Sequence, residues 1–119
     1  MTKKNQDLEM MQGTAKIVTV PVTNSLTGLP LNMTGATINY GVFTSKGAGV
    51  AVLEKSVGSG IVLVSEDGTN DAVQITLDAV DTNDLLPGRY YHECRVTLNG
   101  KPEVVFEGRI RLKKSKTVS

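Results

Sequence analysis

The sequence contains no tryptophan, a single cysteine and a single histidine in 119 residues, and aromatic residues make up only 4% of it. With one cysteine, an intramolecular disulfide is impossible and a cysteine-based metal site lacks its ligands. With so few aromatic residues, the core has to be built mainly from valine, isoleucine and leucine. Stability therefore has to come from aliphatic packing rather than from cross-links.

An excess of charge of either sign is also absent. The formal net charge is +1, so no overall field attracts nucleic acid or an anionic membrane. Residues 1–12 lack the apolar core of a signal peptide, and no apolar run approaches the length that spans a membrane. We therefore expect a protein made in the cytoplasm, with neither nucleic acid nor membrane among its partners.

Short runs of alternating apolar and polar residues fill most of the chain, and turn residues separate them. No long amphipathic helix interrupts the runs, and the length suits one domain. The pattern predicts an all-β fold, a single antiparallel immunoglobulin-like β-sandwich of about seven strands over residues 13–113. A flexible arm or short helix (1–12) and a loose basic tail (114–119) would flank it. The predicted strands are 14–24, 36–45, 50–56, 61–65, 72–78, 89–98 and 103–112.

The stretch from Asp81 to Cys94 predicts a corner in the chain. Asp81 can cap a helix N-terminus, residues 82–86 then form one helical turn, and Pro87-Gly88 ends it. The most strand-like run of the protein follows. We expect this corner to position the strand after it.

The last two predicted strands are joined by Asn99-Gly100, a typical two-residue hairpin turn. Such a turn pairs Leu98 with Lys101, and this register sets the apolar face of one strand against the polar face of the other. We therefore predict a three-residue loop, 98–100, that shifts the register by one. The expected neighbours across the hairpin are Cys94 with Val104 and His92 with Phe106.

His92 and Cys94 are the residues whose chemistry is most suggestive of catalysis. They lie two apart on one strand, so both point to the same side, and a Cys-His dyad is conceivable. That side also carries Tyr90, Val96 and Leu98. We interpret both residues as part of the core, and we predict no catalytic, cofactor-binding or metal-binding residue.

The remaining polar groups allow a structural interpretation, which we prefer in each case. No helix follows the Gly-x-Gly pairs, so they form turns rather than a phosphate site. An acidic loop could bind calcium, but its spacing matches no EF-hand. The basic tail could contact nucleic acid, but it has no aromatic residues interleaved with its lysines, so we interpret it as a solvated terminus. Arginines and glutamates on the last two strands can pair across the hairpin. These groups are Gly47, Gly49, Gly58 and Gly60; Glu66, Asp67 and Asp71; Lys113, Lys114 and Lys116; and Arg89, Arg95, Arg109 and Arg111 with Glu93, Glu103 and Glu107.

Two short motifs carry a resemblance to a known family. One is L-x-x-T-G-A-T, beginning at Leu31, and the other is D-T-x-x-L-x-P-G-x-Y-Y-x-E, beginning at Asp81. With these motifs, residues 13–113 resemble the immunoglobulin-like domain at the N-terminus of tailed-phage upper-baseplate proteins and related small phage virion proteins. His92 and Cys94 depart from it, since large or β-branched apolar residues would be expected there.

The resemblance implies a non-enzymatic structural component of a bacteriophage virion, in the tail, the baseplate or as a head accessory such as a capsid decoration. Its expected partners are other virion proteins and copies of itself, in a homo-oligomer within the particle, with no cofactor. The alternative is a surface-binding module for host carbohydrate or another cell-surface ligand. Such sites usually use exposed Trp or Tyr rings, and this chain offers only Tyr40, Tyr90 and Tyr91.

Overall fold

The structure is a computed structural model of the chain, and it describes residues 4–23, 29, 31–45, 47–64, 71–83 and 85–114. Within these residues the chain forms nine strands and one short helix. Every segment predicted to be a strand contains one, so the all-β prediction is confirmed. Glu66 and Asp67 of the predicted acidic loop, and the tail beyond residue 114, lie outside the described residues. The elements are β1 (Lys4–Asn5), β2 (Leu8–Met11), β3 (Lys16–Pro21), β4 (Thr37–Phe43), β5 (Leu53–Val57), β6 (Gly60–Val64), β7 (Ala72–Leu77), α1 (Ala79–Asn83), β8 (Gly88–Leu98) and β9 (Lys101–Lys113).

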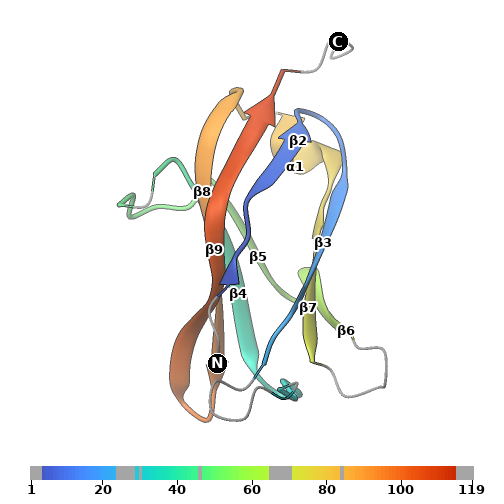
Figure 1. Ribbon diagram of the computed structural model, residues 1–119. Coiled ribbons are helices and arrows are strands. Elements are labelled where there is room, and N and C mark those ends of the chain that lie inside the picture. Colours follow the sequence, from blue (N-terminus) through green and yellow to red (C-terminus); the bar gives the residue numbers. More distant parts are fainter. Residues whose placement is uncertain are drawn as a thin grey trace.

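The strands form two layers, as Figure 1 shows. One layer runs in the order β1 and β2, β9, β8, β4, β5, and the other in the order β6, β7, β3. A short parallel bridge between β5 and β6 joins them at Ser56↔Gly60 and Val57↔Ile61. The other pairs are antiparallel, except that β1 and β2 run parallel to β9. This arrangement, with β8 and β9 as a hairpin beside β4 and β7 between β3 and β6, is an immunoglobulin-like sandwich.

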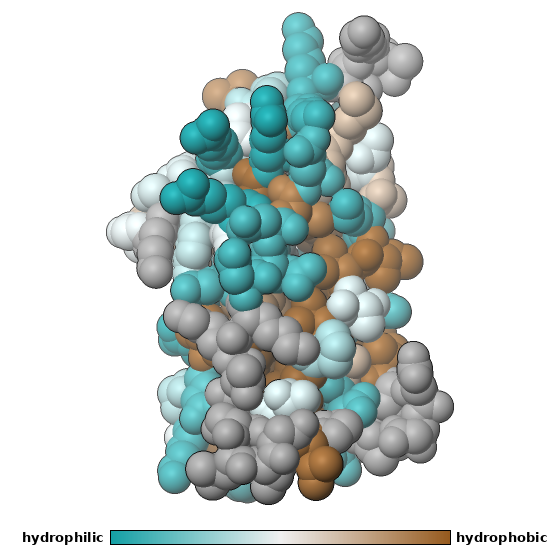
Figure 2. All heavy atoms as spheres, in the orientation of Figure 1, coloured by the Kyte–Doolittle hydropathy of each residue, from teal (hydrophilic) through white to brown (hydrophobic). Residues whose placement is uncertain are grey.

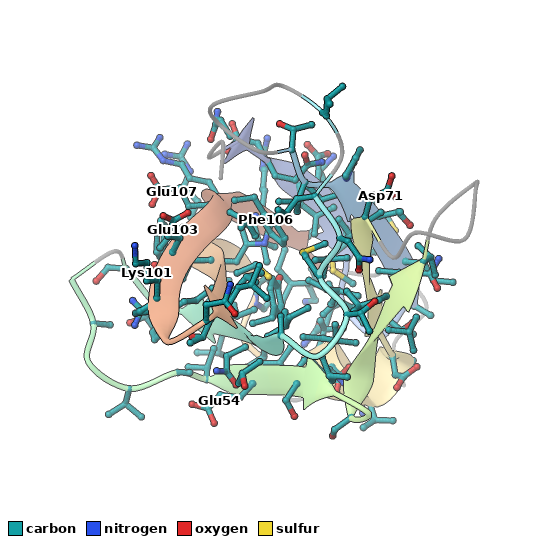
Figure 3. The ribbon with its side chains drawn as sticks, turned by 90° about the horizontal axis from the view of Figure 1, so that it is seen from below. Glu54, Asp71, Lys101, Glu103, Phe106 and Glu107 are labelled. Carbon is teal, nitrogen blue, oxygen red and sulfur yellow. The ribbon has the colours of Figure 1, made fainter. Side chains whose placement is uncertain are left out.

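The core lies between the layers and follows the period-two pattern of the strands. Val18 and Val20 of β3 are buried, while Ile17 and Thr19, which alternate with them, are exposed. In place of a tryptophan, Phe106 occupies the interior, and Figure 3 shows its ring between the layers. The other fully buried large side chains are Met33, Ile38, Ile61, Ile75, Leu77, His92, Val20, Val22, Val73, Val96 and Val105.

The β8–β9 hairpin differs from our prediction in its loop. Leu98 pairs directly with Lys101, so Asn99-Gly100 forms a two-residue turn, and both turn residues have positive φ (54° and 77°). The predicted three-residue loop is therefore wrong. Positive φ at both positions is typical of a type I′ turn, whose twist suits the flanking strands.

The expected shift of register does occur, but inside β9. The pairing slips by one between Cys94 and Arg95, because Val105 is inserted as a β-bulge between their partners. Val105 and Phe106 are consequently both buried. Cys94 thus pairs with Phe106 rather than with Val104, and the residue directly opposite His92 is Gly108. His92 nevertheless lies near Phe106, as predicted, with ring centroids 5.5 Å apart. The apolar faces still meet, as the hydrophobic pattern requires.

The helix at the corner begins earlier than predicted. It spans Ala79–Asn83, so the prediction of a turn at 82–86 with Asp81 as the N-cap is wrong. Asp78 precedes the helix, and the carboxylate of Asp81 in the first turn accepts a hydrogen bond from the Asp78 N–H (2.7 Å), as the fourth residue of a capping box does. Asp81 Oδ2 also forms an ion pair with Lys55 Nζ at 2.8 Å. The acid therefore fixes both the helix start and the contact of α1 with β5.

Beyond the helix, a tyrosine hydroxyl fixes the entry into β8. Tyr90 Oη donates to the carbonyl of Leu86 at 2.5 Å. This bond has the form of the tyrosine corner found in immunoglobulin-like domains. The stretch from Asp81 to Cys94 is therefore a structural corner.

The N-terminal segment is neither a disordered arm nor a short helix where the structure describes it. β1 and β2 lie parallel to β9, with Lys4 opposite Phe106 and Met11 opposite Lys113. Met10 is buried and belongs to the core. The flexibility that we predict for this segment in solution stays a prediction.

Candidate interaction surfaces

His92 is fully buried, and each of its ring nitrogens has one partner. Nε2 lies 2.5 Å from the carbonyl oxygen of Gln6, and Nδ1 lies 2.8 Å from Tyr40 Oη. A carbonyl can only accept, so Nε2 carries the proton and Nδ1 accepts from the tyrosine hydroxyl. Burial lowers the pKa of His92, and the hydrogen bond to Gln6 opposes this effect. The ring is a neutral group that is hydrogen-bonded within the core.

Cys94 and Tyr40 are sealed into the same part of the core. Cys94 is buried and free, and burial raises the pKa of its thiol to about 12. Burial also raises the pKa of Tyr40. A thiolate is the reactive form of cysteine, so a thiol with this pKa is a poor nucleophile. The position of both candidate residues in the core agrees with our interpretation.

The bond to His92 distorts the N-terminal segment between β1 and β2. The Gln6 carbonyl turns inward to the histidine, and Gly108 of β9 lies directly beneath it, where a Cβ atom would collide with the carbonyl. The Arg109 N–H donates instead to the Asp7 carboxylate at 2.9 Å. The Asp7 side chain thus replaces a backbone acceptor of the ladder. We did not foresee this arrangement, because Gln6 and His92 are 86 residues apart.

The outer face of β8 and β9 carries a cluster of charged side chains, and we call it the charged face. Its register places Arg89 opposite Arg111 and Glu93 opposite Glu107. Like charges therefore lie directly opposite each other at these two positions. Along β8, Arg95 forms an ion pair with Glu93 at 3.5 Å. The predicted pairing of arginines with glutamates elsewhere across the hairpin stays a prediction. The residues of the charged face are Arg89, Tyr91, Glu93, Arg95, Glu107, Arg109 and Arg111.

Tyr91 lies at the centre of the charged face. Its hydroxyl donates to Glu107 and lies 3.3 Å from Glu93 Oε2. Burial raises the pKa of Tyr91, and the Glu107 carboxylate adds to the effect. On the neighbouring strand the ring of Phe43 packs beside it, with ring centroids 6.4 Å apart. The half-buried rings form an aromatic centre within charged surroundings.

Two open grooves border this aromatic pair. One has a volume of about 600 Å³ and is lined by Tyr91, Arg89, Arg109 and Asp7, among others. The other has a volume of about 560 Å³ and lies over β4, β5 and β8, with Phe43 in its lining. Figure 2 shows the hydrophilic side chains gathered over β8 and β9. Neither groove contains the buried His92 or Cys94.

The outer face of the other layer carries no charged side chain within the described strands, and we call it the uncharged face. Ile17 lies opposite Thr76, and Thr19 opposite Gln74, whose Nε2 donates to Thr19 Oγ1 at 3.4 Å. Val62 lies on the other side of Gln74. Sequence reasoning missed this face, although the odd and even positions of the predicted strands contained the signal. Its residues are Ile17, Thr19, Pro21, Val62, Val64, Gln74 and Thr76.

The other groups considered from the sequence are not brought together as a site. Gly58 and Gly60 have positive φ in the β5–β6 connection, as turn residues do. Glu66 and Asp67 lie outside the described residues, and so does Lys116. Lys113 forms an ion pair with Glu9 of β2. Among the residues that the structure places, no group of three or more His, Cys, Asp or Glu could hold a metal ion. In that same part of the chain, none of the helices has the length and apolar character to cross a membrane.

Comparisons with known proteins give similarity in structure only. No family model matches the sequence, and no curated protein matches it. The N-terminal domain of phage TP901-1 ORF48 is similar at a TM-score of 0.49, with 14% identity, 98% of this chain and 100% of that chain covered. The NK cell receptor Nkp44 is similar at 0.48, with 16% identity and coverage of 94% and 99%. CopC from Methylosinus trichosporium OB3b is similar at 0.46, with 15% identity and coverage of 100% and 91%. Scores and identities this low carry no argument about function, and the description of the fold rests on the strand pairing given above.

Proposed function

We propose that this chain is a non-enzymatic structural component of a bacteriophage virion, in the tail, the baseplate or as a head accessory. In this role it is a protein-protein assembly module that binds other virion proteins and copies of itself. Virion localisation, after assembly in the host cytoplasm, belongs to the same proposal.

The observation that carries the assembly role is the separation of the two outer faces from the core. The side chains with catalytic potential, His92 and Cys94, are buried and bonded or packed inside. The surface instead offers a charged face on one layer and an uncharged face on the other. Such a molecule acts through what its faces bind rather than through a reaction at a cleft.

The phage setting rests on the resemblance of the two motifs. The second motif coincides with the corner, where Asp81 supports the start of α1 and Tyr90 bonds back to Leu86. The motif residues therefore have structural tasks, as expected for a motif that specifies a fold rather than a reaction.

Mass spectrometry of particles purified from the host strain that encodes the chain tests the proposal. We expect the protein in the particles at a fixed ratio to the major virion proteins, retained after washing at high salt. Its absence from every particle fraction would refute the virion role.

A second candidate function, the recognition of a carbohydrate on the host surface, is favoured by one feature. Phe43 and Tyr91 form an aromatic pair between two open grooves that also contain carboxylates and guanidinium groups. Aromatic faces with polar groups nearby suit ligands that are partly apolar and rich in hydroxyls.

A glycan array with the purified protein separates the two functions. Specific, saturable binding that is lost in Phe43→Ala but kept in Thr76→Ala, on the opposite layer, would favour carbohydrate recognition. Absence of binding, together with recovery in particles, would leave assembly as the function.

A further inference from the structure

The outer edge of β3 is open in the described structure. β3 pairs only with β7, and the Val22 N–H donates to the Asp71 carbonyl at 2.9 Å. In an antiparallel ladder, alternate residues turn their N–H and C=O groups to the same side. The backbone groups of Val18 and Val20 therefore face β7, and those of Ile17 and Thr19 face away from it.

This edge lacks the usual protection. Exposed edge strands normally carry charged side chains, a bulge or several prolines, which prevent pairing with another chain. Here Ile17 is 61% exposed, and Pro21 stands at the end of the strand rather than at its centre. The one charged residue, Lys16, donates to the Glu9 carbonyl at 3.2 Å and so turns back towards β2.

We propose that β3 binds the β3 strand of a second copy of this chain, edge to edge and antiparallel. With the two-fold axis at Val18, Ile17 of each copy pairs with Thr19 of the other. In this register, the outward N–H and C=O groups of Ile17 and Thr19 all form hydrogen bonds to the second copy. Pro21 is the last residue of β3 and has no N–H. In this register it lies opposite Ala15 of the second copy, a residue that precedes the strand, so no ladder bond within the strand is lost.

Charge favours a second copy over a charged partner segment. In this register each Lys16 lies opposite Val20 of the second copy, so the two lysines do not face each other. The two uncharged faces become one continuous face across the new sheet, with no like-charge contact. Hydrophobic residues gather along this side of the molecule, beside the hydrophilic cluster over β9, as Figure 2 shows. This dimer deepens the proposed assembly role and rests on it for its biological setting.

Sedimentation of the full chain over a wide concentration range tests the dimer. We expect a concentration-dependent dimer for the natural sequence. Thr19→Pro removes an N–H that the folded monomer does not use, and it should weaken association on the order of tenfold or more. The matched control is Thr76→Lys, which adds a charge to the same face but on β7, away from the edge. It should dimerise like the natural sequence.

Hydrogen exchange provides a readout that needs no variant. The amides of Ile17 and Thr19 should exchange rapidly in dilute protein and gain protection as concentration rises, while those of Val18 and Val20 are protected throughout. A monomer at all concentrations, or a dimer unaffected by Thr19→Pro, would overturn the proposal. So would loss of the dimer in Thr76→Lys alone, which would indicate face-to-face stacking. A monomeric protein that is still present in virions would refute this dimer and leave the assembly role intact.

Discussion

His92 connects three distant parts of the chain through one neutral ring. It donates to Gln6, accepts from Tyr40 and packs against Phe106, with ring centroids 5.5 Å apart. Each bond satisfies a polar group that is out of contact with bulk water, where an unpaired group would be costly. The polar cluster therefore belongs to the stability of the core.

Stability should fall as the pH drops below about 6.5, the ordinary pKa of histidine. Burial lowers the pKa of His92 in the folded state, so the unfolded chain takes up a proton first. The free energy of unfolding then decreases by up to about 1.4 kcal/mol per pH unit until the folded state is protonated too. Chemical denaturation at pH 5 to 8 measures this. His92→Gln is the control, in which the free energy of unfolding should no longer fall with pH just below about pH 6.5. An unchanged pH dependence in this variant would show that other groups cause it.

Tyr40→Phe should destabilise the protein by about 1–3 kcal/mol, because it leaves Nδ1 of His92 buried without a donor. Tyr90→Phe is the comparison. It removes a more exposed hydroxyl, bonded to Leu86, and should cost about 0.5–1.5 kcal/mol. Urea denaturation of both variants measures the difference. Equal costs would mean that the Tyr40 bond contributes no more than the exposed one.

At the scale of elements, the N-terminal strands are held by a feature of β9 rather than by their own sequence. Gly108 leaves room for the Gln6 carbonyl, and Asp7 completes the ladder at Arg109. A polar segment of this kind has no strand pattern of its own. Its strands form because β9 offers an edge with a gap at the right place.

Gly108→Ala should release the N-terminal segment while the sandwich stays folded. The added Cβ collides with the Gln6 carbonyl, which is backbone and cannot turn aside without losing the bond to His92. We expect a loss of about 1–3 kcal/mol, with rapid hydrogen exchange at residues 5–11 and retained protection in β4 and β8. Gly47→Ala, where nothing lies within 4 Å, is the control. Full protection of the segment in Gly108→Ala would contradict this account.

The corner before β8 allows a second prediction at this scale. Pro87-Gly88→Ala-Ala should cost about 1–3 kcal/mol, since Gly88 has a φ of 150° that other residues rarely adopt. Thermal denaturation of the double variant and of each single variant measures the cost. If the melting temperature does not change, the corner is not what positions β8.

The hairpin shows how far the sequence specifies an element. The alternation of β8 and the mismatch in register could be predicted, because both follow from which side chains are apolar. The place where the register shifts could not be predicted. A bulge at Val105 and a longer loop at Asn99 would both bring the apolar faces of the two strands together. The same limit applies to the pairing of β1 and β2 with β9, which depends on Gly108 and His92 far along the chain. The uncharged face, in contrast, could have been identified from the strand positions alone.

For the whole molecule, the two layers differ in what they present outward. Figure 3 shows Lys101, Glu103 and Glu107 pointing out from β9, while Phe106 points into the interior. The layer of β3, β6 and β7 carries no charge on the outer face of its described strands. The molecule therefore has one surface suited to electrostatic contacts and one suited to contacts that exclude charge.

Raising the salt concentration should act differently on the two surfaces. Contacts through the charged face should weaken as the screening length shortens from about 10 Å at 0.1 M to about 3 Å at 1 M. Self-association through β3 should stay the same or strengthen, because it involves backbone bonds and apolar side chains. Sedimentation and binding to purified virion proteins in both buffers measure the two effects. A dimer that dissociates at 1 M salt would place the contact on the charged face instead.

The parallel pairing of the N-terminal strands with β9 has a mechanical consequence. β2 and β9 run in the same direction and share one register from Lys4↔Phe106 to Met11↔Lys113 (Figure 1). A force that pulls the chain before β1 and the chain after β9 in opposite directions would slide the two strands along each other. All their hydrogen bonds would then bear the load together rather than open one after another. Such shear geometry resists pulling more strongly than a geometry in which the hydrogen bonds open one at a time.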